Sequence, residues 1–592
     1  MSRRAIRIAN VSGFYGDQHD AMREMVTQGD PVDVVTGDYL AELTMLILWK
    51  ARRRDPSAGY ARTFLTQLET VLGACLDRGT KIVVNAGGLN PSGLADQVRE
   101  LGERLGLHPR VAQVRGDDLM GQLEHLRRQG VPLTHLDTGE SLTGEPVTAN
   151  AYLGGWGITE ALAGDADIVL TGRVTDASLV TGPAAWWHGW HTDDFDALAG
   201  AVAAGHVIEC GPQACGGNYP FIDELPDHRY PGFPIAEVAS DGSSVITKQP
   251  GTGGLVSVGT VTAQLLYEIG DPAYLNPDVT ARFDSTVLEQ VGPDRVLMSG
   301  TCGHAPTDSL KVAINLEGGY RNTVTMVITG LDINKKADFA VDQLFERVGG
   351  REQFDRVDVD LVRHDHRDAD RNAEATAHLR ISVASADEAR VGRAFSNVAT
   401  AMAVASYPGL HTTHPPAPAS AYGVYWPALV PRDQVTHEVV LPDGGVRTIP
   451  DPPLTAAPVH HGDTDQTPPA HGPVASGSQA RTRLLPLGRL VGGRSGDKGG
   501  NANVGLWARD DAAFAWLDQN LDVAAFRRLL PEADDLPIRR YRLANLRALN
   551  FVVVGWLGEG VSSCTRPDPQ AKGLAEYIRS RTLAIPVDLV RE

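Results

Sequence analysis

The sequence contains few cysteines and few aromatic residues. Among its 592 residues there are five cysteines, and Phe, Trp and Tyr together make up 6% of the chain. The number of cysteines is odd, and none of them forms a close CxxC pair. A disulfide framework and a zinc finger are therefore both excluded.

Long apolar runs are also absent. No segment approaches the roughly 20 consecutive apolar residues that a transmembrane helix needs. The basic start Met1–Arg4 is not followed by the apolar segment that is typical of a secretory signal. We therefore expect a cytoplasmic protein that does not insert into membranes.

Positive charge is in deficit, because the formal net charge is -19 and the isoelectric point is about 5.4. This balance argues against nucleic acid or an anionic membrane as a partner. The chain is 42% hydrophobic and 21% charged, as soluble globular proteins are. At roughly 100–200 residues per domain, its length predicts several domains.

Two nucleotide-binding fingerprints are missing as well. No GxGxxG motif follows the first apolar run, so we do not expect a dinucleotide enzyme. The glycine-rich segment 494–503 contains Lys498 but lacks the GxxxxGK[ST] spacing of a phosphate-binding P-loop.

The first 245 residues alternate short apolar runs with amphipathic stretches, which predicts an α/β lobe around a mainly parallel sheet. The predicted strands are Ile6–Val11, Val32–Thr36, Ile82–Asn85, Val111–Val114 and Ile168–Thr171. The predicted helices between them include Tyr39–Lys50, Ala61–Arg78 and Leu94–Leu105.

The rest of the chain divides by composition. Residues 246–450 are predicted to form an α+β second lobe, with strands at Val256–Thr262, Val312–Leu316, Thr323–Ile328 and Leu379–Val383. Residues 451–482 are rich in Pro, Gly, Ser and Thr, which indicates a flexible linker. Residues 483–592 are predicted to form a small α/β sandwich, with strands at Leu487–Val491, Asn503–Trp507 and Phe551–Leu557.

Glycine-punctuated polar loops follow two of the predicted strands near the start of the chain. The loop 12–17 (SGFYGD) contains Tyr15, and the loop 85–91 (NAGGLNP) contains Asn85 and Asn90. Glycine lets the backbone approach a ligand, and ligands of open α/β sheets bind at the carboxyl ends of the strands. We therefore expect a small-molecule site there.

Acidic pairs follow two more strands. Asp38 and Glu42 are spaced to share one helical face, where they could act as general acid and base. Alternatively, Asp38 is a helix N-cap and Glu42 a solvated acid. The adjacent Asp117 and Asp118 have the oxygen ligands that Mg²⁺ prefers, although two solvated loop acids are the commoner outcome of this pattern.

Two further segments carry candidate groups. Arg173 and Asp176 could bind a phosphate or carboxylate and move a proton, or form a structural ion pair. In the segment 208–219, Glu209 is a candidate acid or base and Asn218 a candidate binding residue. Cys210 or Cys215 is a candidate nucleophile there, but free cysteines are more often small core residues.

Lysines lie beside glycine-rich segments in both halves of the chain. Lys248 precedes Gly251–Gly254, a pattern that suits either anion binding or a tight turn. Lys498 lies with Asn501 and Asn503 in the predicted loop 494–503, whose backbone N–H groups could form an anion-binding nest.

These motifs together resemble one known family. The segments SGFYGD, TGDYLAELTM, NAGGLNP, GDDL, TGRVTDASL, IECGPQACGGNY and KQPGTGG are similar to those of the acyclic terpene utilisation (AtuA-like) family. RSGDKGGNANVGLWAR resembles the small ferredoxin-fold domain that is fused to such proteins or occurs as a separate chain.

The resemblance implies a role in the breakdown of acyclic terpenoids, whose routes run through branched acyl-CoA thioesters. We expect an enzyme that hydrates, cleaves or hydrolyses an acyl-CoA, with CoA as part of the substrate and a homo-oligomeric assembly. The alternative is a non-catalytic binding or scaffold subunit of such a pathway, which the tethered two-module build also suits. The resemblance carries no established catalytic residues.

Overall fold

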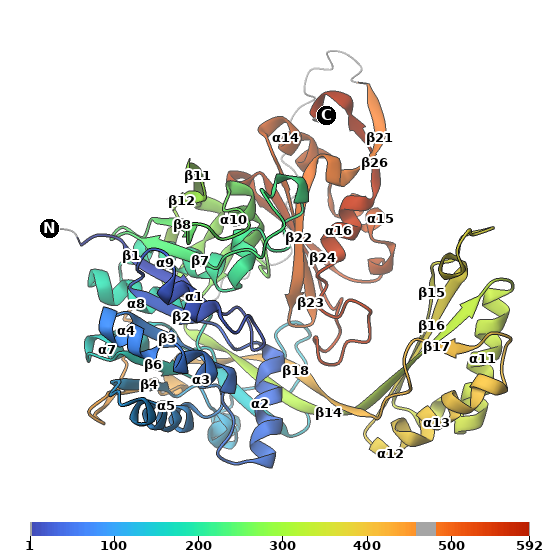
Figure 1. Cartoon of the computed structure of the whole chain (residues 1–592), viewed down its shortest axis with the longest axis horizontal. Helices are drawn as coiled ribbons and strands as arrows, with labels where there is room; N and C mark the ends of the chain where they lie inside the picture. The colour runs from blue at the N-terminus through green and yellow to red at the C-terminus, as the bar shows by residue number, and fades with distance from the viewer. Residues whose placement is uncertain (1–2, 458–480, 591–592) are drawn as a thin grey trace. The chain divides into compact units, whose positions relative to one another are not determined.

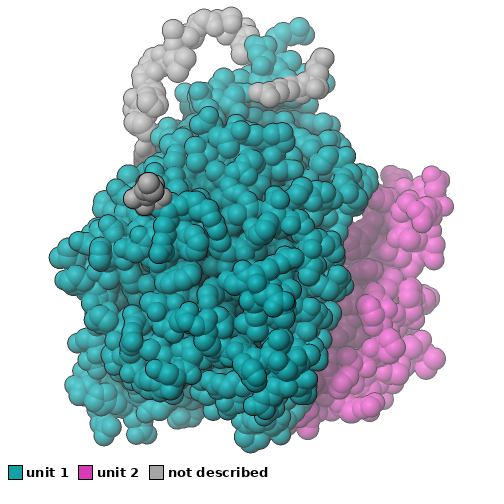
Figure 2. Space-filling view, turned by 60° about the vertical axis from the view of Figure 1, so that its left-hand side comes forward, with its two compact units in different colours: residues 1–315, 425–561, 570–592 teal, residues 316–424, 562–569 magenta. Residues whose placement is uncertain are grey.

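The computed structural model describes residues 3–457 and 481–590, so most of the predicted linker lies outside the described residues. The chain divides into two compact units, which Figure 2 colours teal and magenta. Unit 1 comprises Met1–Asn315, Tyr425–Val561 and Gln570–Glu592, and unit 2 comprises Leu316–Val424 and Ser562–Pro569. The predicted domain boundaries at residues 245, 450 and 482 remain predictions.

The centre of unit 1 is a parallel sheet, as the sequence predicts. Its five parallel strands lie in the order β1 (Ile6–Asn10), β2 (Val34–Gly37), β3 (Lys81–Val84), β6 (Ile168–Thr171) and β4 (Val111–Arg115). All four residues of β2 and of β6 are buried. Such continuous burial is typical of parallel strands that are covered on both faces.

Antiparallel strands extend this sheet on both sides. Beyond β1 lie β7 (Pro234–Val238), β8 (Ser244–Lys248), β12 (Arg295–Ser299) and β11 (Val287–Gly292). Beyond β4 lie β19 (Glu438–Val440) and β20 (Val446–Thr448). Because antiparallel partners can flank a parallel core, the sheet is mixed rather than purely parallel.

Helices cover both faces of the sheet (Figure 1). One face packs against α1 (Ala21–Thr27), α3 (Arg62–Glu69), α4 (Leu72–Arg78) and α5 (Pro91–Leu105). The other carries α8 (Ser178–His188) and α9 (Phe195–Ile208). The single helix predicted over Ala61–Arg78 is two helices, since the chain leaves helical geometry at Val71.

One of the strands predicted in residues 246–450 is wrong. The segment predicted as the strand Val256–Thr262 contains the start of helix α10 (Val258–Leu265). Its β-branched residues favour a strand, but Ser257 caps the helix by accepting a hydrogen bond from the Thr260 N–H at 3.2 Å. The helix is apolar because most of it is buried, so its pattern lacks the alternation of an exposed helix.

Unit 2 is built on antiparallel strands. The chain enters it through β14 (Ser309–Thr329), a single long strand where two shorter ones were predicted, at Val312–Leu316 and Thr323–Ile328. β14 pairs with β16 (Thr376–Ser385), which pairs with β15 (Arg356–Arg363). The helices α11 (Ile333–Val348) and α13 (Arg393–Ala401) form an apolar core with one face of this sheet.

The last part of unit 1 is a ferredoxin-like domain. Its antiparallel sheet has the order β22 (Val491–Lys498), β23 (Asn501–Ala508), β25 (Ala548–Val553) and β24 (Ile538–Leu543). Its helices are α14 (Asp511–Asn520), α15 (Val523–Leu529) and α16 (Leu574–Ser580). In Figure 1 β22 runs beside α10, although the two elements are far apart in the sequence.

The hairpin β22–β23 corrects the predicted glycine-rich loop. Leu487–Val491, predicted as a strand, is a short 3-10 turn followed by the first residue of β22. The predicted loop 494–503 is the paired ends of β22 and β23, joined at Gly499 and Gly500. Gly499 has φ 63°, a conformation that glycine adopts without strain. Lys498 therefore extends from a strand end rather than from a loop.

Candidate functional site

The polar residues at the ends of the parallel strands converge. The Asn85 side chain, after β3, donates to Asp38 Oδ1 at 2.5 Å and accepts from the Tyr39 N–H at 2.7 Å. The Asp38 N–H donates to the Ser12 carbonyl after β1 at 2.8 Å. The parallel order of β1, β2 and β3 brings these loops to one edge of the sheet.

Arg173, after β6, joins this group. Its guanidinium donates to Asp176 Oδ1 at 2.8 Å and to the Leu40 carbonyl at 3.2 Å. It also lies 4.3 Å from the ring centroid of Tyr152. Arg173 is buried, whereas the Asp176 side chain keeps 27% of its surface exposed. The predicted pair exists, and its carboxylate remains open to a ligand.

Glu209 follows the C-terminus of α9 and is held against β1. Asn10 donates to the Glu209 carbonyl at 2.7 Å. The ring nitrogen Nδ1 of His206 lies 3.2 Å from Glu209 Oε1, and Glu209 Oε2 is buried with no hydrogen-bond partner among the described residues. An orphaned carboxylate oxygen in a polar cluster is an atom that a ligand can satisfy.

The ferredoxin-like domain contributes side chains to the same cluster. The Arg494 guanidinium donates to Gln213 Oε1 and lies 4.1 Å from the Tyr267 ring centroid. The Lys498 ammonium lies 5.4 Å from the ring centroid of Tyr274. The hairpin of the same chain thus brings a lysine to the edge of the α/β sheet.

A third group comes from α2 (Glu42–Arg54), β14 and β18 (Ser420–Pro431). Lys311 Nζ lies 3.7 Å from Glu42 Oε1, and 5.1 and 5.6 Å from the ring centroids of Tyr152 and Tyr425. The Lys311 and Glu42 side chains are 32% and 23% exposed. An ammonium beside two phenol rings is suited to hold a carboxylate or a carbonyl oxygen.

The electrostatics of the cluster favour neutral acids and a neutral amine. Burial, followed by Asp176, raises the pKa of Glu209 and of Asp38 well above their usual range. Burial also raises the pKa of Glu268. Burial and the nearby Lys311 lower the pKa of Lys498. Groups with such opposing shifts can exchange protons near neutral pH.

The cysteines behave differently. Burial, followed by Glu268 and Glu209, raises the pKa of the Cys210 thiol well above its usual range. Burial likewise raises the pKa of Cys215. A reactive cysteine needs a lowered pKa, so this environment favours the reading of both as packed thiols.

Three other candidate residues have local structural partners, and a fourth is exposed. Asn90 caps α5 by accepting from the Gly93 N–H at 2.9 Å, and the Tyr15 ring packs against the core. Lys248 donates to Thr252 and lies 3.3 Å from Asp294 Oδ2. Asn218 is exposed, with φ 57°.

Asn501 and Asn503 of β23 each form hydrogen bonds with segments that are distant in the sequence. Asn501 donates to Asp137 Oδ1 at 2.9 Å and accepts from the Gly555 N–H at 2.8 Å. Asn503 donates to the Leu266 carbonyl at 2.6 Å and accepts from the Glu268 N–H at 2.9 Å. These contacts position the hairpin against the loop after α10.

Asp117 and Asp118 point to different environments. Asp117 is buried and accepts from the Arg173 N–H at 2.8 Å and from Asn150 at 2.9 Å, whereas Asp118 is exposed. Burial raises the pKa of Asp117 to about 6. Within residues 3–457 and 481–590, no three His, Cys, Asp or Glu side chains are grouped to hold a metal ion. The magnesium hypothesis rests on the sequence pattern alone.

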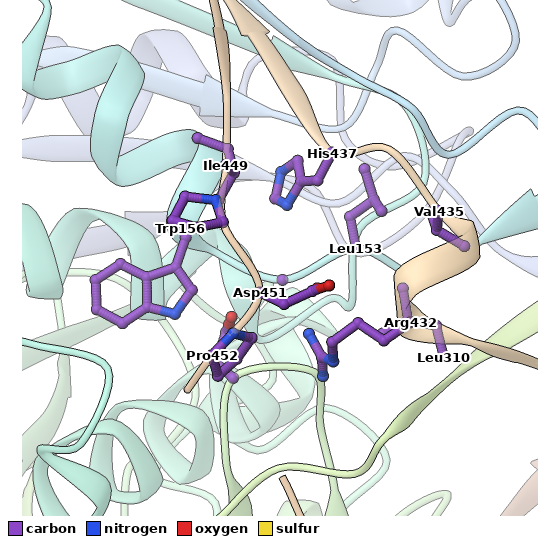
Figure 3. A pocket seen from close by; sticks show the side chains of 12 residues that line it. Leu153, Trp156, Leu310, Arg432, Val435, His437, Ile449, Asp451 and Pro452 are labelled. Atoms are coloured by element: carbon purple, nitrogen blue, oxygen red, sulfur yellow. The ribbon is translucent and has the colours of Figure 1, made fainter. Parts of the chain in front are cut away.

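A separate small cavity is lined by Leu153 and its neighbours (Figure 3). Its volume is about 20 Å³, and its lining includes Asp278, Arg432, His437 and Asp451. This is room for about one water molecule. It is too small for an acyl thioester, so it is not the candidate site.

Sequence reasoning missed several members of the cluster, namely Tyr152, His206, Glu268, Tyr274, Lys311 and Tyr425. The Gly154–Gly155 pair could have marked Tyr152, whereas the other five lie beside no pair of glycines. Lys311 is the clearest example, because it lies between the apolar residues Leu310 and Val312 at the start of β14. A charged side chain in such a run is the one available indication.

Comparisons with known proteins agree with this architecture. Among the described residues, no helix is long and apolar enough to span a bilayer. The family model "Acyclic terpene utilisation family protein AtuA" matches residues 6–441, and the AtuA ferredoxin-like domain matches residues 485–584. No curated protein and no solved structure matches the chain. The chain therefore belongs to the acyclic terpene utilisation (AtuA) family and carries the AtuA ferredoxin-like domain fused at its C-terminal side.

Proposed function

We propose that this protein is an acid–base enzyme of the hydratase or lyase class that acts on a branched or terpenoid-derived acyl-CoA thioester. The observation that carries the proposal is the group of Glu209, Asp38 and Lys498 at one sheet edge, where the pKa values of the acids are raised and that of the amine is lowered. Membership of the acyclic terpene utilisation family supports the substrate class.

Glu209 is the best candidate for the general acid. Its raised pKa favours the protonated carboxyl, and its orphaned Oε2 is available for a substrate. In a hydration, the oxygen of water bonds to C3 of an unsaturated thioester while a base takes one of its protons. The acid then supplies a proton to C2, so the reaction is balanced without a cofactor.

Asp38 and Asp176 are the candidate bases, and the cations are candidates for binding. Arg173 holds Asp176 at 2.8 Å, which fixes the position of this carboxylate at the sheet edge. Lys311 can hold the thioester oxygen, on which negative charge develops as the bond to C3 forms. The partial exposure of Asp176, Glu42 and Lys311 leaves these groups accessible to a small molecule.

The test is product analysis by mass spectrometry with a panel of branched unsaturated and 3-hydroxy acyl-CoA thioesters, with and without Mg²⁺. We expect conversion by the native chain, and Glu209→Gln should reduce the rate by about 10²–10⁴-fold. Asp193→Asn is the matched control, because Asp193 is an exposed acid outside the candidate site, and it should leave the rate unchanged.

Two outcomes contradict the proposal. One is full activity in Glu209→Gln, which would remove the acid from the mechanism. The other is the absence of conversion of any thioester while acyl-CoA still raises the unfolding midpoint. That combination supports the alternative of a non-catalytic binding subunit.

A further inference from the structure

One side of helix α2 changes from apolar to cationic along its length. Residues three or four positions apart lie on the same face of a helix. On one such stripe two apolar residues are followed by two cations, namely Leu43, Ile47, Lys50 and Arg54. Leu43 and Ile47 are 39% and 41% exposed, Arg54 is exposed, and Lys50 is half-buried. The stripe therefore offers a ligand an apolar half and a positively charged half.

The apolar half begins at the candidate site. Glu42, the first residue of α2, lies 3.7 Å from Lys311 Nζ. The Leu40 carbonyl, just before the helix, accepts a hydrogen bond from Arg173 at 3.2 Å. A molecule whose carbonyl oxygen is held by Lys311 thus has Leu43 beside it, and the cations lie further along the helix.

The cationic half is not neutralised by the acids next to it. Residues 50–54 contain four cations, and Glu42 is the one acid in α2, in a chain whose net charge is -19. Asp55 follows the helix, but its carboxylate accepts a hydrogen bond from Arg62 at 3.0 Å. The Arg54 side chain forms no hydrogen bond or ion pair with any residue that the structure describes. This end of α2 is therefore suited to an anion.

A purely structural role explains only part of this pattern. Cations in the last turn stabilise a helix through its dipole. That effect does not require the exposed Leu43 and Ile47 on the same stripe. A ligand that is uncharged at one end and anionic at the other is complementary to both halves.

The length of the stripe fits one part of the proposed substrate. From Leu43 to Arg54 the helix rises about 17 Å, at roughly 1.5 Å per residue. In an acyl-CoA, roughly 13 bonds join the thioester sulfur to the first phosphorus, and they span about 15 Å when extended, by analogy with an extended peptide chain. The uncharged pantetheine arm comes first and the phosphates come after it, which is also the order of the stripe.

We propose that this stripe of α2 binds the CoA part of the substrate. The pantetheine arm lies along Leu43 and Ile47, and the phosphates pair with Lys50 and Arg54. The proposal rests on the proposed function and deepens it, because it names the subsite that recognises the carrier. The protein should therefore prefer CoA to carriers that lack the phosphates.

The experiment measures the affinity of the full-length protein for CoA and for pantetheine by isothermal titration calorimetry at low salt. We expect CoA to bind at least about tenfold more tightly than pantetheine, because charged pairs with phosphate add to the affinity. The double variant Lys50→Ala/Arg54→Ala should weaken CoA binding about tenfold and leave pantetheine binding unchanged. Added salt should weaken CoA binding more in the native protein than in this variant.

Two further variants serve as controls. Arg127→Ala/Arg128→Ala removes two exposed cations from the end of α6 (Leu123–Arg128), whose two leucines are buried. This helix end has no exposed apolar stripe, so the affinity for CoA should stay unchanged. Leu43→Ser should weaken the binding of CoA and of pantetheine by a similar factor, because both contain the arm.

Two results overturn the proposal. One is equal affinity for CoA in the native protein and in Lys50→Ala/Arg54→Ala. The other is binding to phosphatidylserine vesicles that is lost in this variant while CoA still binds it as it binds the native protein. That result assigns the stripe to an anionic lipid surface instead.

The outcomes separate this inference from the proposed function. Turnover that depends on Glu209, with an affinity for CoA that does not depend on Lys50 and Arg54, overturns the subsite and leaves the acid–base enzyme. An affinity for CoA that depends on Lys50 and Arg54, without turnover of any thioester, supports the subsite and overturns the enzyme in favour of a binding subunit.

Discussion

Asn503 of the ferredoxin-like domain holds the backbone of Glu268 through a hydrogen bond of 2.9 Å from the Glu268 N–H to Asn503 Oδ1. Its amide also donates to the Leu266 carbonyl at 2.6 Å. Glu268 has φ 55°, which is uncommon for a residue with a side chain. One buried asparagine thus fixes both the strained turn after α10 and the hairpin that ends at Lys498.

Asn503→Ala should therefore destabilise the protein and lower its activity. Two backbone groups lose their partner, and each buried unsatisfied group costs about 1–3 kcal/mol. Chemical denaturation measures the free energy of unfolding, and Asn520→Ala is the control because Asn520 is exposed. Equal stability of the two variants would show that the hairpin is held by other contacts.

The pH dependence of kcat/KM should report the proton on Glu209. Because its pKa is raised, the acid form persists above the usual range, and activity should fall as the pH rises through that pKa. Rate profiles from about pH 5 to pH 9 check this. In Glu209→Gln the residual activity should lack this basic limb. If the fall in activity at basic pH persists in Glu209→Gln, it reports the titration of another group, such as Lys498.

Asp117→Asn should flatten the pH dependence of stability. The pKa of Asp117 is raised from 3.8 to about 6, so its stabilising effect is complete below pH 3.8 and is lost as the pH rises through 6. The loss amounts to about 3 kcal/mol at most, since each unit of pKa shift is worth about 1.4 kcal/mol.

Urea unfolding of the native protein and of Asp117→Asn across this pH range measures the difference. Asp193→Asn is the control, because Asp193 is an exposed acid that does not act on the pKa of Asp117, and it should leave the slope unchanged. If Asp117→Asn showed the same loss of stability with rising pH as the native protein, another buried acid such as Asp278 would be responsible.

Gly13→Ala should lower both stability and activity, because the added methyl group would collide with the backbone of Cys210. A Cβ at Gly13 would lie 2.7 Å from the carbonyl carbon of Cys210 and 2.9 Å from its Cα. Backbone cannot move aside as a flexible side chain can, so the segment that carries Glu209 must shift. We expect a loss of about 1–3 kcal/mol in stability together with reduced activity.

Gly121→Ala is the matched control for this substitution. A Cβ at Gly121 meets no atom within 4 Å, so its stability and activity should stay close to those of the native protein. Activity and unfolding are measured on both variants. Unchanged activity in Gly13→Ala would place the reacting groups away from Glu209.

Much of the fold follows from local pattern. The parallel strands β1, β2, β3, β4 and β6 were predicted to within a few residues, because a buried strand between glycine and a helix is a strong local feature. The helix α10 was missed, since a buried apolar helix and a buried strand have similar sequences. The single strand β14 was read as two, because its length exceeds what local periodicity reveals.

The candidate site, like the fold, was predicted from the sequence only in part. The sequence alone determined the family, the parallel sheet, and the placement of Asp38, Asn85 and Arg173 at strand ends, because glycine and polar residues mark those ends locally. Only the tertiary structure decided that Lys498 lies within electrostatic range of Glu209. That proximity depends on the docking of β22 beside α10, which is a contact between distant segments. The shifts in pKa arise from burial and from neighbours in space, which no linear spacing encodes.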